Sequence, residues 1–357
     1  MQDERGDAED FLMRVAWLYY EENLTQADIA EALGVSRSTV VRALGEARER
    51  GLVRIELVHP LFNVCTVERQ LKTSFGLQDA VVVPAPPEYT ESNLWRALGR
   101  AGALYLRRHL RDGTVLGTAW GATLFHVARN AGGRKLRDFS VVMLLGGHTA
   151  AMQSMNPSEI ARLMAEAYGG TCYPLYVPAV VSSSAIRDAL LSDHGIRTNL
   201  ELAKSVQIAL VGIGSTSDDS SVVRSGVVSP EQVSLLRLRG AVGDICYRYF
   251  DLDGRPVRSE LDDRVIGIDL EDLTRIPRVV AVAGGPKKVR SILGALRGGF
   301  VDVLITDDTT ARRVLQEHLS AGVQARPTTA ARSVGQGGSG RGKTRIGLPS
   351  GPGVPAS

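Results

Sequence analysis

Short apolar runs that end in glycine or aspartate and then give way to a helical pattern constrain the fold of this chain more than any other feature. Each run has the length of one buried strand, and the stretch after it repeats apolar residues at the spacing of an amphipathic helix. Strands that alternate with helices in this way build a parallel sheet covered by helices on both faces. The runs lie at 80–84, 115–119, 140–147, 207–214, 278–285 and 301–308. Most of the chain is therefore predicted to be an α/β domain.

Helical patterns fill the intervals between these strands. They lie near residues 90–110, 121–131, 157–168, 184–191, 286–297 and 309–319. In open α/β sheets, ligands bind beyond the carboxyl ends of the strands, where the chain turns from strand to helix. The glycine-rich corners at these turns are therefore the expected place for a binding site.

The N-terminal part of the chain follows a different plan. Between Leu24 and Leu44, two short helical patterns are separated only by Leu33-Gly34-Val35. Gly34 suits a left-handed turn, and the small Ala30 and the apolar Val40 stand where two such helices would touch. Two helices joined by a three-residue turn that contains glycine are typical of a helix-turn-helix. The alternative is a generic helical hairpin with a solvated polar face.

Start signals set the limits of these helices. Thr25 is a good N-cap, with the carboxylate of Asp28 three residues later, and Ser36 can cap the following helix. An apolar stripe at 11–22 predicts another helix before them. Residues 52–58 have the pattern of a short strand, so a winged helix-turn-helix is expected.

The second helix of this motif opens with polar residues, which fits a helix whose N-terminal end faces a major groove rather than a core. The residues expected at base edges are Arg37, Ser38, Thr39 and Arg42. The residues expected to bind phosphates are Thr25, Gln26 and Ser36. Residues 1–60 carry seven arginines against twelve acids, whereas residues 36–54 carry five against two. Binding to DNA would therefore use a local basic patch.

The corner at residues 117–123, GTAWGAT, combines two glycines with two threonine hydroxyls at the start of a predicted helix. Backbone N–H groups exposed by glycine at a helix N-terminus favour an anion, although such corners are often purely structural. The candidate ligand residues of this corner are Gly117, Thr118, Trp120, Gly121 and Thr123.

Further corners and two charged side chains are expected at the same edge of the sheet. These candidates are Gly146, Gly147, His148, Gly214, Ser215, Asp244 and Lys288. Lys288 stands in the first turn of a predicted helix, where it could balance a phosphate, and Asp244 could accept hydrogen bonds from sugar hydroxyls. The alternatives are a solvated lysine and a helix-capping aspartate. His148 has no metal ligand at useful spacing, so no metal ion and no cofactor are expected.

Together these segments make the chain resemble the SorC-type sugar-binding transcriptional regulators. The resemblance covers roughly residues 10–319, and its segments stand in the family's order. They are GTAWGATL (117–124), PLYVPAVV (174–181), IALVGIGS (208–215), GAVGDICYRYFD (240–251), DDRVIGI (262–268), AGGPKKVRSILGALRGG (283–299) and VDVLITDD (301–308). Each segment alone is common, whereas the set is highly specific.

The resemblance implies a Rossmann-like effector domain, similar to the glucosamine-6-phosphate deaminase and ribose-5-phosphate isomerase fold, behind an N-terminal helix-turn-helix. It also implies double-stranded operator DNA upstream of carbohydrate genes, a sugar or sugar-phosphate effector, and assembly into homodimers or homotetramers. By position, the phosphate loop maps to Gly117, Trp120, Gly121 and Thr123, the sugar carboxylate to Asp244 and the lysine to Lys288. Lys287, where the family carries an acid, and His148 are departures that leave the identity of the sugar open.

Four segments are expected along the chain: a DNA-binding domain at 1–59, a connecting helix at 60–78, an effector domain at 79–319 and a tail at 320–357. The tail is rich in Gly, Ser and Pro and carries five Lys or Arg and no acid, a composition expected to be disordered. No apolar run reaches the roughly 18 residues of a membrane span. The acidic N-terminus lacks the layout of a secretory signal. A cytoplasmic protein without a membrane partner is expected.

Two other functions stay open at this point. A sugar-phosphate isomerase or deaminase fused to a DNA-binding module would need a positioned general base, for which Asp244, Asp307 and Asp308 are available. An architectural DNA-binding protein would rely on the basic tail and would bind with little sequence preference. No second group with a clear catalytic role accompanies the aspartates, so a regulator is preferred to an enzyme.

Overall fold

The computed structural model describes residues 3–53, 60–148 and 156–320 of the 357-residue chain. The tail predicted at 320–357 lies outside the described residues apart from Ser320, as does most of the strand predicted at 52–58. The chain divides into two compact units, Met1–Asn63 and Val64–Ser357, and each is described by itself.

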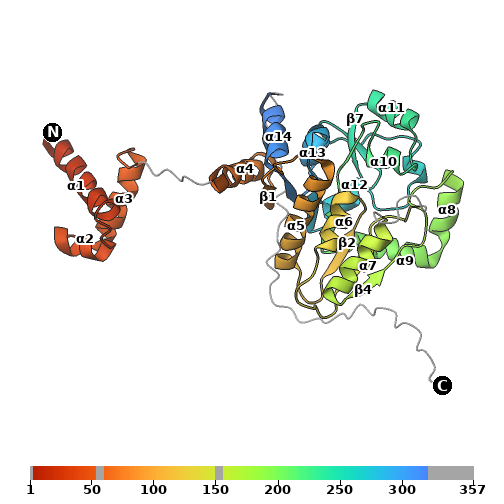
Figure 1. Cartoon of the computed structure of the whole chain (residues 1–357), viewed down its shortest axis with the longest axis horizontal. Coiled ribbons are helices and arrows are strands. Elements are labelled where there is room, and N and C mark those ends of the chain that lie inside the picture. The colour runs from red at the N-terminus through yellow and green to blue at the C-terminus, as the bar shows by residue number, and fades with distance from the viewer. Residues whose placement is uncertain (1–2, 54–59, 149–155, 321–357) are drawn as a thin grey trace, which may run out of the picture. The chain divides into compact units, whose positions relative to one another are not determined.

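Three helices make up the N-terminal unit: α1 (Asp3–Tyr20), α2 (Gln26–Leu33) and α3 (Arg37–Glu49) (Figure 1). Val15, Ile29 and Val40, one from each helix, are fully buried in their shared core. The helix-turn-helix is therefore confirmed, with Val40 as its apolar wedge. α1 begins well before the predicted residue 11, because the acidic residues ahead of the apolar stripe suit the start of a helix.

Gly34 makes the turn between α2 and α3, as the sequence predicts. Its φ of 63° lies in the left-handed region, and its N–H donates to carbonyls in the last turn of α2. At the start of α2, Thr25 and Asp28 form a capping box, in which Thr25 N donates a 3.1 Å hydrogen bond to the Asp28 carboxylate. Ser36 caps α3 by accepting a 3.1 Å hydrogen bond from Thr39 N.

A seven-stranded sheet forms the centre of the C-terminal unit, and all of its neighbouring strands run parallel. The order across the sheet is β1-β10-β9-β5-β2-β3-β4. The strands are β1 (Asp79–Val83), β2 (Val115–Thr118), β3 (Ser140–Met143), β4 (Thr171–Tyr173), β5 (Ile208–Val211), β9 (Arg278–Val282) and β10 (Val303–Asp307). The apolar runs predict every one of these strands except β4, which has no buried residue.

Helices connect the strands and cover the sheet. They are α4 (Pro60–Phe75), α5 (Glu91–His109), α6 (Ala122–Arg129), α7 (Pro157–Tyr168), α8 (Ser184–Ser192), α9 (His194–Lys204), α10 (Ser221–Arg224), α11 (Pro230–Leu238), α12 (Leu270–Arg275), α13 (Val289–Arg297) and α14 (Asp308–Ser320). Helices α5, α6 and α7 lie side by side, and α14 packs on β1 and β10 (Figure 1). The α/β architecture is confirmed. None of the described helices is both long and apolar enough to cross a membrane.

Helix α4 is fastened to the edge strand β1. The Glu68 carboxylate accepts a 2.9 Å hydrogen bond from Val82 N, and Lys72 Nζ lies 3.5 Å from the Asp79 carboxylate. Burial raises the pKa of Glu68, so this contact removes a carboxylate from water. From Val64 onward, the helix expected as a connector is part of the C-terminal unit.

The C-terminal unit also contains a smaller, antiparallel sheet, which the sequence pattern does not predict. It joins β6 (Gly214–Ser215), β7 (Ala241–Ile245) and β8 (Arg248–Asp251). β6 follows directly after β5, so the small sheet begins at the carboxyl edge of the large sheet. A two-residue loop, Cys246-Tyr247, links β7 to β8.

Candidate functional site

A cavity lies where the strand order of the large sheet changes direction. From β2 the chain adds β3 and β4 on one side, and it then places β5, β9 and β10 on the other. Loops after β2 and β5 diverge at such a point and leave a crevice between them. The cavity is lined by residues 119–123, 212–214 and 282–284, at or beyond the ends of β2, β5 and β9. Its free volume of about 70 Å³ exceeds the roughly 10–15 Å³ that one water needs, so small polar groups can enter.

The first turn of α6 forms one wall of this cavity. Its N-cap is Gly121, which has a φ of 131° and provides no side-chain cap. The N–H groups at the start of a helix carry partial positive charge and bind anions readily. Thr123 Oγ1 donates a 2.9 Å hydrogen bond to the carbonyl of Val282 and so ties α6 to β9. An anion here would therefore be held by the backbone of α6 rather than by the Thr123 hydroxyl.

Asp244, on β7, presents a buried carboxylate to the cavity. It is only 3% exposed; its Oδ2 accepts a 3.1 Å hydrogen bond from Tyr247 N, and its Oδ1 has no hydrogen-bond partner among the described residues. Burial raises the pKa of Asp244 to about 6, an effect that the nearby Lys288 partly offsets. Buried polar atoms are normally paired, so an unpaired carboxylate oxygen in a cavity is suited to accept a hydrogen bond from a ligand.

Lys288 ends the short 3₁₀ turn Pro286–Lys288 after β9 and also lines the cavity. Burial lowers the pKa of Lys288 to about 8, while the Asp244 carboxylate acts in the opposite direction. The preceding Lys287 is engaged elsewhere, because its Nζ pairs with Asp219 and lies 3.8 Å from Glu91. Of the two adjacent lysines, only Lys288 is placed to neutralise an anion in the cavity.

A second hollow adjoins the cavity and shares Trp95, Ser221, Gly284 and Lys288 with it. Its other polar lining residues are Tyr89, Glu91, Ser215, Ser217, Asp219, Ser220, Arg224 and Lys287. Hydroxyl groups and charges of both signs can form hydrogen bonds with a polyol. The two spaces together provide an anion-binding end and a polar end.

The loop that follows Asp244 is strained. Cys246 and Tyr247 have φ values of 53° and 63°, so both are in the left-handed region. A two-residue hairpin with two positive φ angles favours Asn-Gly, and a non-glycine residue there costs about 1–3 kcal/mol. Both side chains are buried, which means that the surrounding packing holds the loop, and with it Asp244, in this conformation.

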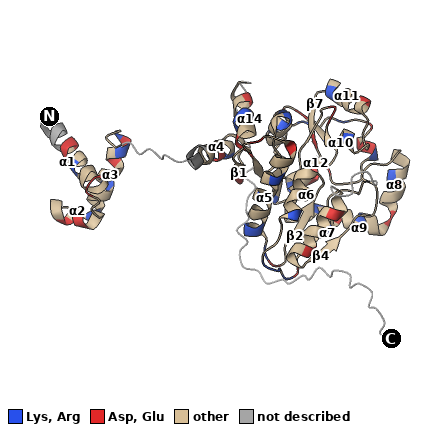
Figure 2. Ribbon diagram, in the orientation of Figure 1, with Lys and Arg blue, Asp and Glu red and all other residues tan. Residues whose placement is uncertain are grey.

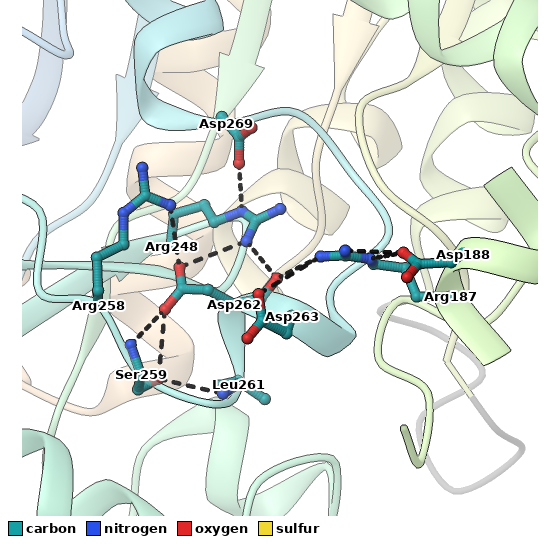
Figure 3. Close-up of polar contacts among 9 residues, drawn as sticks. All are labelled: Arg187, Asp188, Arg248, Arg258, Ser259, Leu261, Asp262, Asp263 and Asp269. Carbon is teal, nitrogen blue, oxygen red and sulfur yellow. Dashed lines mark hydrogen bonds and ion pairs between the residues drawn. The ribbon is translucent and has the colours of Figure 1, made fainter. Parts of the chain in front are cut away.

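Arg248 anchors the same hairpin from its other strand (Figure 3). Its Nη1 donates a 2.9 Å hydrogen bond to the carbonyl of Asp262, and its Nε lies 2.9 Å from the Asp269 carboxylate. The Asp262 carbonyl also accepts a longer, 3.4 Å hydrogen bond from Arg187 of α8. Because the Arg248 side chain is only 9% exposed, these charge-assisted contacts form in a low-dielectric setting and fix the hairpin firmly.

The structure brings together about half of the residues predicted to bind the effector. Trp120, Gly121, Thr123, Gly214, Asp244 and Lys288 line the cavity. Ser215 lines the adjoining hollow, and His148 contacts the Trp120 ring without lining either space.

Besides His148, four predicted residues lie outside the lining of both spaces, and their packing explains why. A Cβ at Gly117 would lie 2.5 Å from the Leu144 side chain, and one at Gly146 would lie 2.5 Å from the carbonyl of Val177. Gly147 donates its N–H to the same carbonyl at 2.7 Å. Thr118 is fully buried within β2. These positions serve close packing between strands and loops.

Several residues that line the cavity are not predicted from the sequence. Among the described residues, Trp95, Ser221 and Cys246 line the cavity without forming part of a glycine-rich corner. Trp95 belongs to α5 and Ser221 to α10, so only the tertiary fold brings them to the site. A signal existed for Cys246, since it follows the candidate Asp244 by two residues.

The aspartates that a catalytic function could use are engaged in the fold. Asp307 accepts hydrogen bonds from Thr310 Oγ1 at 2.6 Å and from Gly285 N at 3.0 Å. Asp308 accepts one from Ala85 N at 2.8 Å. In the described part of the chain, no group of His, Cys, Asp or Glu side chains could hold a metal ion. Of these three aspartates, only Asp244 lines the cavity.

In the N-terminal unit, a hollow beside the start of α3 gathers three of the predicted DNA-contacting residues. Its lining is Tyr19, Tyr20, Asn23, Leu24, Thr25, Gln26, Ala27 and Arg37. The aromatic pair and Asn23 were not among the sequence candidates. Asn23 has a φ of 55°, a conformation that asparagine tolerates better than most residues.

The exposed end of α3 carries the remaining candidates. Arg37, Ser38 and Arg42 are exposed, and the N-terminal helices carry both basic and acidic residues (Figure 2). Ser36 Oγ lies 2.8 Å from both Ser38 Oγ and Thr39 Oγ1, so these hydroxyls already form a small network. The arginines are therefore the groups freest to reach a base edge.

Both units match known protein families. Residues 59–316 match the Sugar-bind family model, a sugar-binding domain, and residues 15–58 match the MarR family model. The chain is 35% identical over 306 residues to the deoxyribonucleoside regulator of Bacillus subtilis, which covers 85% of this chain and 97% of that protein. It is 31% identical over 320 residues to the sorbitol operon regulator of Klebsiella pneumoniae, covering 88% and 100%. The crystal structure of full-length SorC from Klebsiella pneumoniae matches 86% of this chain and 98% of its own, with a TM-score of 0.68 and 29% identity.

Proposed function

Because the chain belongs to the SorC-type family of sugar-binding transcriptional regulators, we propose that a sugar phosphate bound in the cavity controls its affinity for operator DNA. The chain is a DNA-binding transcriptional regulator, in keeping with relatives named as regulators of sorbitol and deoxyribonucleoside operons. The nature of the effector and the way in which it acts are the proposal.

One observation carries the effector assignment. The unpaired Oδ1 of Asp244, the uncapped first turn of α6 and the Lys288 ammonium all belong to one cavity. A helix N-terminus and an ammonium suit a phosphate, and a carboxylate accepts hydrogen bonds from sugar hydroxyls. A sugar phosphate carries both groups, and one of its hydroxyls would donate to Asp244 Oδ1, which has no hydrogen-bond partner among the described residues.

DNA binding is assigned to α3 and to the hollow beside its N-terminus. Arg37 stands at the start of α3, which is the position of the residues that contact base edges in a helix-turn-helix. Contacts with backbone phosphates are proposed for Thr25 and Gln26, at the start of α2. An operator with two half-sites would require a homodimer or a homotetramer, which we include in the proposal together with a cytoplasmic location.

An effector can change operator affinity only by its different affinities for two states of the protein. The effector would close the cavity around Asp244 and Lys288, and the change would reach the N-terminal unit through α4. The proposal leaves the direction of the response, release or tightening, to experiment.

A gel-shift titration on the DNA upstream of the protein's own gene tests this function, at fixed salt and with a panel of pentose and hexose phosphates. At least one compound is expected to change the apparent Kd for DNA and to raise the Tm, since a ligand of the native state stabilises it. Asp244→Asn should abolish the response to that compound while DNA binding persists. Asp263→Asn is the matched control, because this carboxylate is 70% exposed and outside the cavity. If no compound changes either the affinity for DNA or the Tm, the effector assignment is refuted.

A further inference from the structure

Three aromatic side chains form a stack behind the effector cavity. Trp120 lines the cavity, and the Tyr247 ring lies parallel to it, with ring centroids 5.4 Å apart and an angle of 14° between the planes. His148 meets the Trp120 ring edge-on, at 4.3 Å between centroids. A 2.9 Å hydrogen bond joins Tyr247 Oη to His148 Nε2 and closes the triangle. Trp120 is thus in contact with two other aromatic rings, neither of which lines the cavity.

Tyr247 occupies a backbone conformation in which glycine is the favoured residue. Its φ is 63°, in a loop whose other residue, Cys246, also has a positive φ. A bulky residue there is a genuine outlier, and such strain concentrates at ligand sites. Tyr247 is only 1% exposed, so its ring fills space inside the protein rather than at the surface. The contacts of the Tyr247 side chain with Trp120 and His148 stabilise this strained conformation.

We propose that Tyr247 limits the size of the effector by holding Trp120 in place as a wall of the cavity. The inference rests on the function proposed above and adds which effectors the site accepts. With about 70 Å³ of free volume, the cavity suits a phosphate with a small sugar, and the supported indole prevents its extension toward Tyr247. In this role Tyr247 is a positioning residue, since it acts through Trp120 rather than by touching the effector.

Removing the Tyr247 side chain should therefore widen the site without disturbing its anion-binding end. The α6 N-terminus and Lys288 are supplied by segments other than the β7–β8 loop. In Tyr247→Gly the loop keeps a residue that adopts positive φ without strain, and the indole gains room to move back. Tyr247→Phe keeps the stacked ring and loses only the hydroxyl, with its hydrogen bonds to His148 and Ser225.

Calorimetric titration of the full-length protein with three probes tests the inference: inorganic phosphate, D-ribose 5-phosphate and D-fructose 6-phosphate. In the wild type the pentose phosphate should bind at least about tenfold more tightly than the hexose phosphate, which is the discrimination that one extra carbon brings in a tight pocket. Tyr247→Gly should reduce this ratio about tenfold, whereas Tyr247→Phe should keep the wild-type ratio. Inorganic phosphate should bind all three proteins equally.

His148→Ala provides a second variant, since this half-buried residue supports Trp120 from another side and its loss is tolerated more easily by the fold. His148→Ala should also reduce the ratio of pentose-phosphate to hexose-phosphate affinity, but by a smaller factor than Tyr247→Gly does. If both variants still bind phosphate and keep the wild-type ratio of pentose-phosphate to hexose-phosphate affinity, the role proposed for Tyr247 is overturned, while the proposed function stands. Failure of the wild type to bind any of the three probes would overturn this inference together with the proposed function.

Discussion

Gly214 and Asp244 approach each other so closely that a Cβ on the glycine would lie 1.7 Å from Oδ1 of the aspartate. The two residues pair across β6 and β7, so the short small sheet places the carboxylate in the cavity. Gly214→Ala should therefore displace the Asp244 side chain or the strand and lower effector affinity by tenfold or more, measured by calorimetry. Gly45→Ala, at a helical position where a Cβ meets nothing within 4 Å, is the control and should leave effector binding unchanged. Equal affinity in Gly214→Ala and the wild type would show that Asp244 is not held at this position.

Asp244→Asn should make the protein more stable at neutral pH while abolishing the effector response. Burial raises the pKa of this carboxyl from 3.8 to about 6, so the folded state disfavours the charged form. The resulting loss of stability begins as the pH rises above 3.8 and is complete above about 6, where it corresponds to about 3 kcal/mol. Urea unfolding at pH 4.5 and 7.5 checks this, with a gain in the variant expected mainly at pH 7.5. A variant that is destabilised equally at both values would contradict the unpaired state of Asp244.

Lys288→Met should weaken binding of inorganic phosphate by tenfold or more, because a charge-assisted contact in the cavity is lost. Burial lowers the pKa of Lys288 to about 8, so the wild-type affinity should also fall as the pH rises above 8. This fall should be absent in Lys288→Met. Lys204→Met is the matched control, since that lysine pairs with Glu201 and lines neither the cavity nor the adjoining hollow. If both variants bind phosphate alike, the assignment of the anion to Lys288 is wrong.

Arg37→Ala should reduce operator affinity by about 1–3 kcal/mol, the discrimination that one good base contact provides. The residue is exposed at the start of α3, next to the hollow lined by Thr25 and Gln26. Arg50→Ala is the control, because Arg50 follows the far end of α3 and pairs with Glu46. Fluorescence anisotropy with operator and scrambled DNA distinguishes the two, and a loss of equal size on both DNAs would point to a phosphate contact instead.

Arg248→Met should destabilise the protein by about 1–3 kcal/mol, because it removes the hydrogen bond to the Asp262 carbonyl and leaves the Asp262 carboxylate with Ser259 and the more distant Arg258. Adding Asp262→Asn to this variant should restore part of the stability, since the charge that has lost this partner is then removed. Denaturant unfolding of the two single variants and the double variant gives the coupling energy. Strict additivity would show that the contacts drawn in Figure 3 do not act as one network.

The sequence predicted the large sheet well because each of its central strands is a continuous apolar run. β5 is apolar and buried along its whole length, and β10 begins with three buried apolar residues before Thr306 and Asp307. β4 lies at the edge with no buried residue, and β6 has only two residues, so neither leaves a pattern of its own. The Cys246-Tyr247 turn carries none of the usual hairpin residues, which is why the β7–β8 hairpin was not predicted.

The candidate site could be predicted only in part, for a different reason. Gly121 and Gly117 look alike in the sequence, yet one caps α6 at the cavity and the other is packed against Leu144. Which glycine faces a ligand depends on neighbours that are distant in the chain. The same holds for Trp95, which reaches the cavity from α5. Charged residues were more reliable guides, because Asp244 and Lys288 have few structural reasons to be buried.

The contact of Glu68 with β1 has a mechanical consequence. β1 is hydrogen-bonded to β10, and β10 to β9, whose carboxyl end supplies Gly284 to the cavity. Three adjacent strands thus connect the cavity to α4, which contacts β1 through Glu68 and Lys72. A tilt of these three strands would move α4, whose first residues belong to the N-terminal unit.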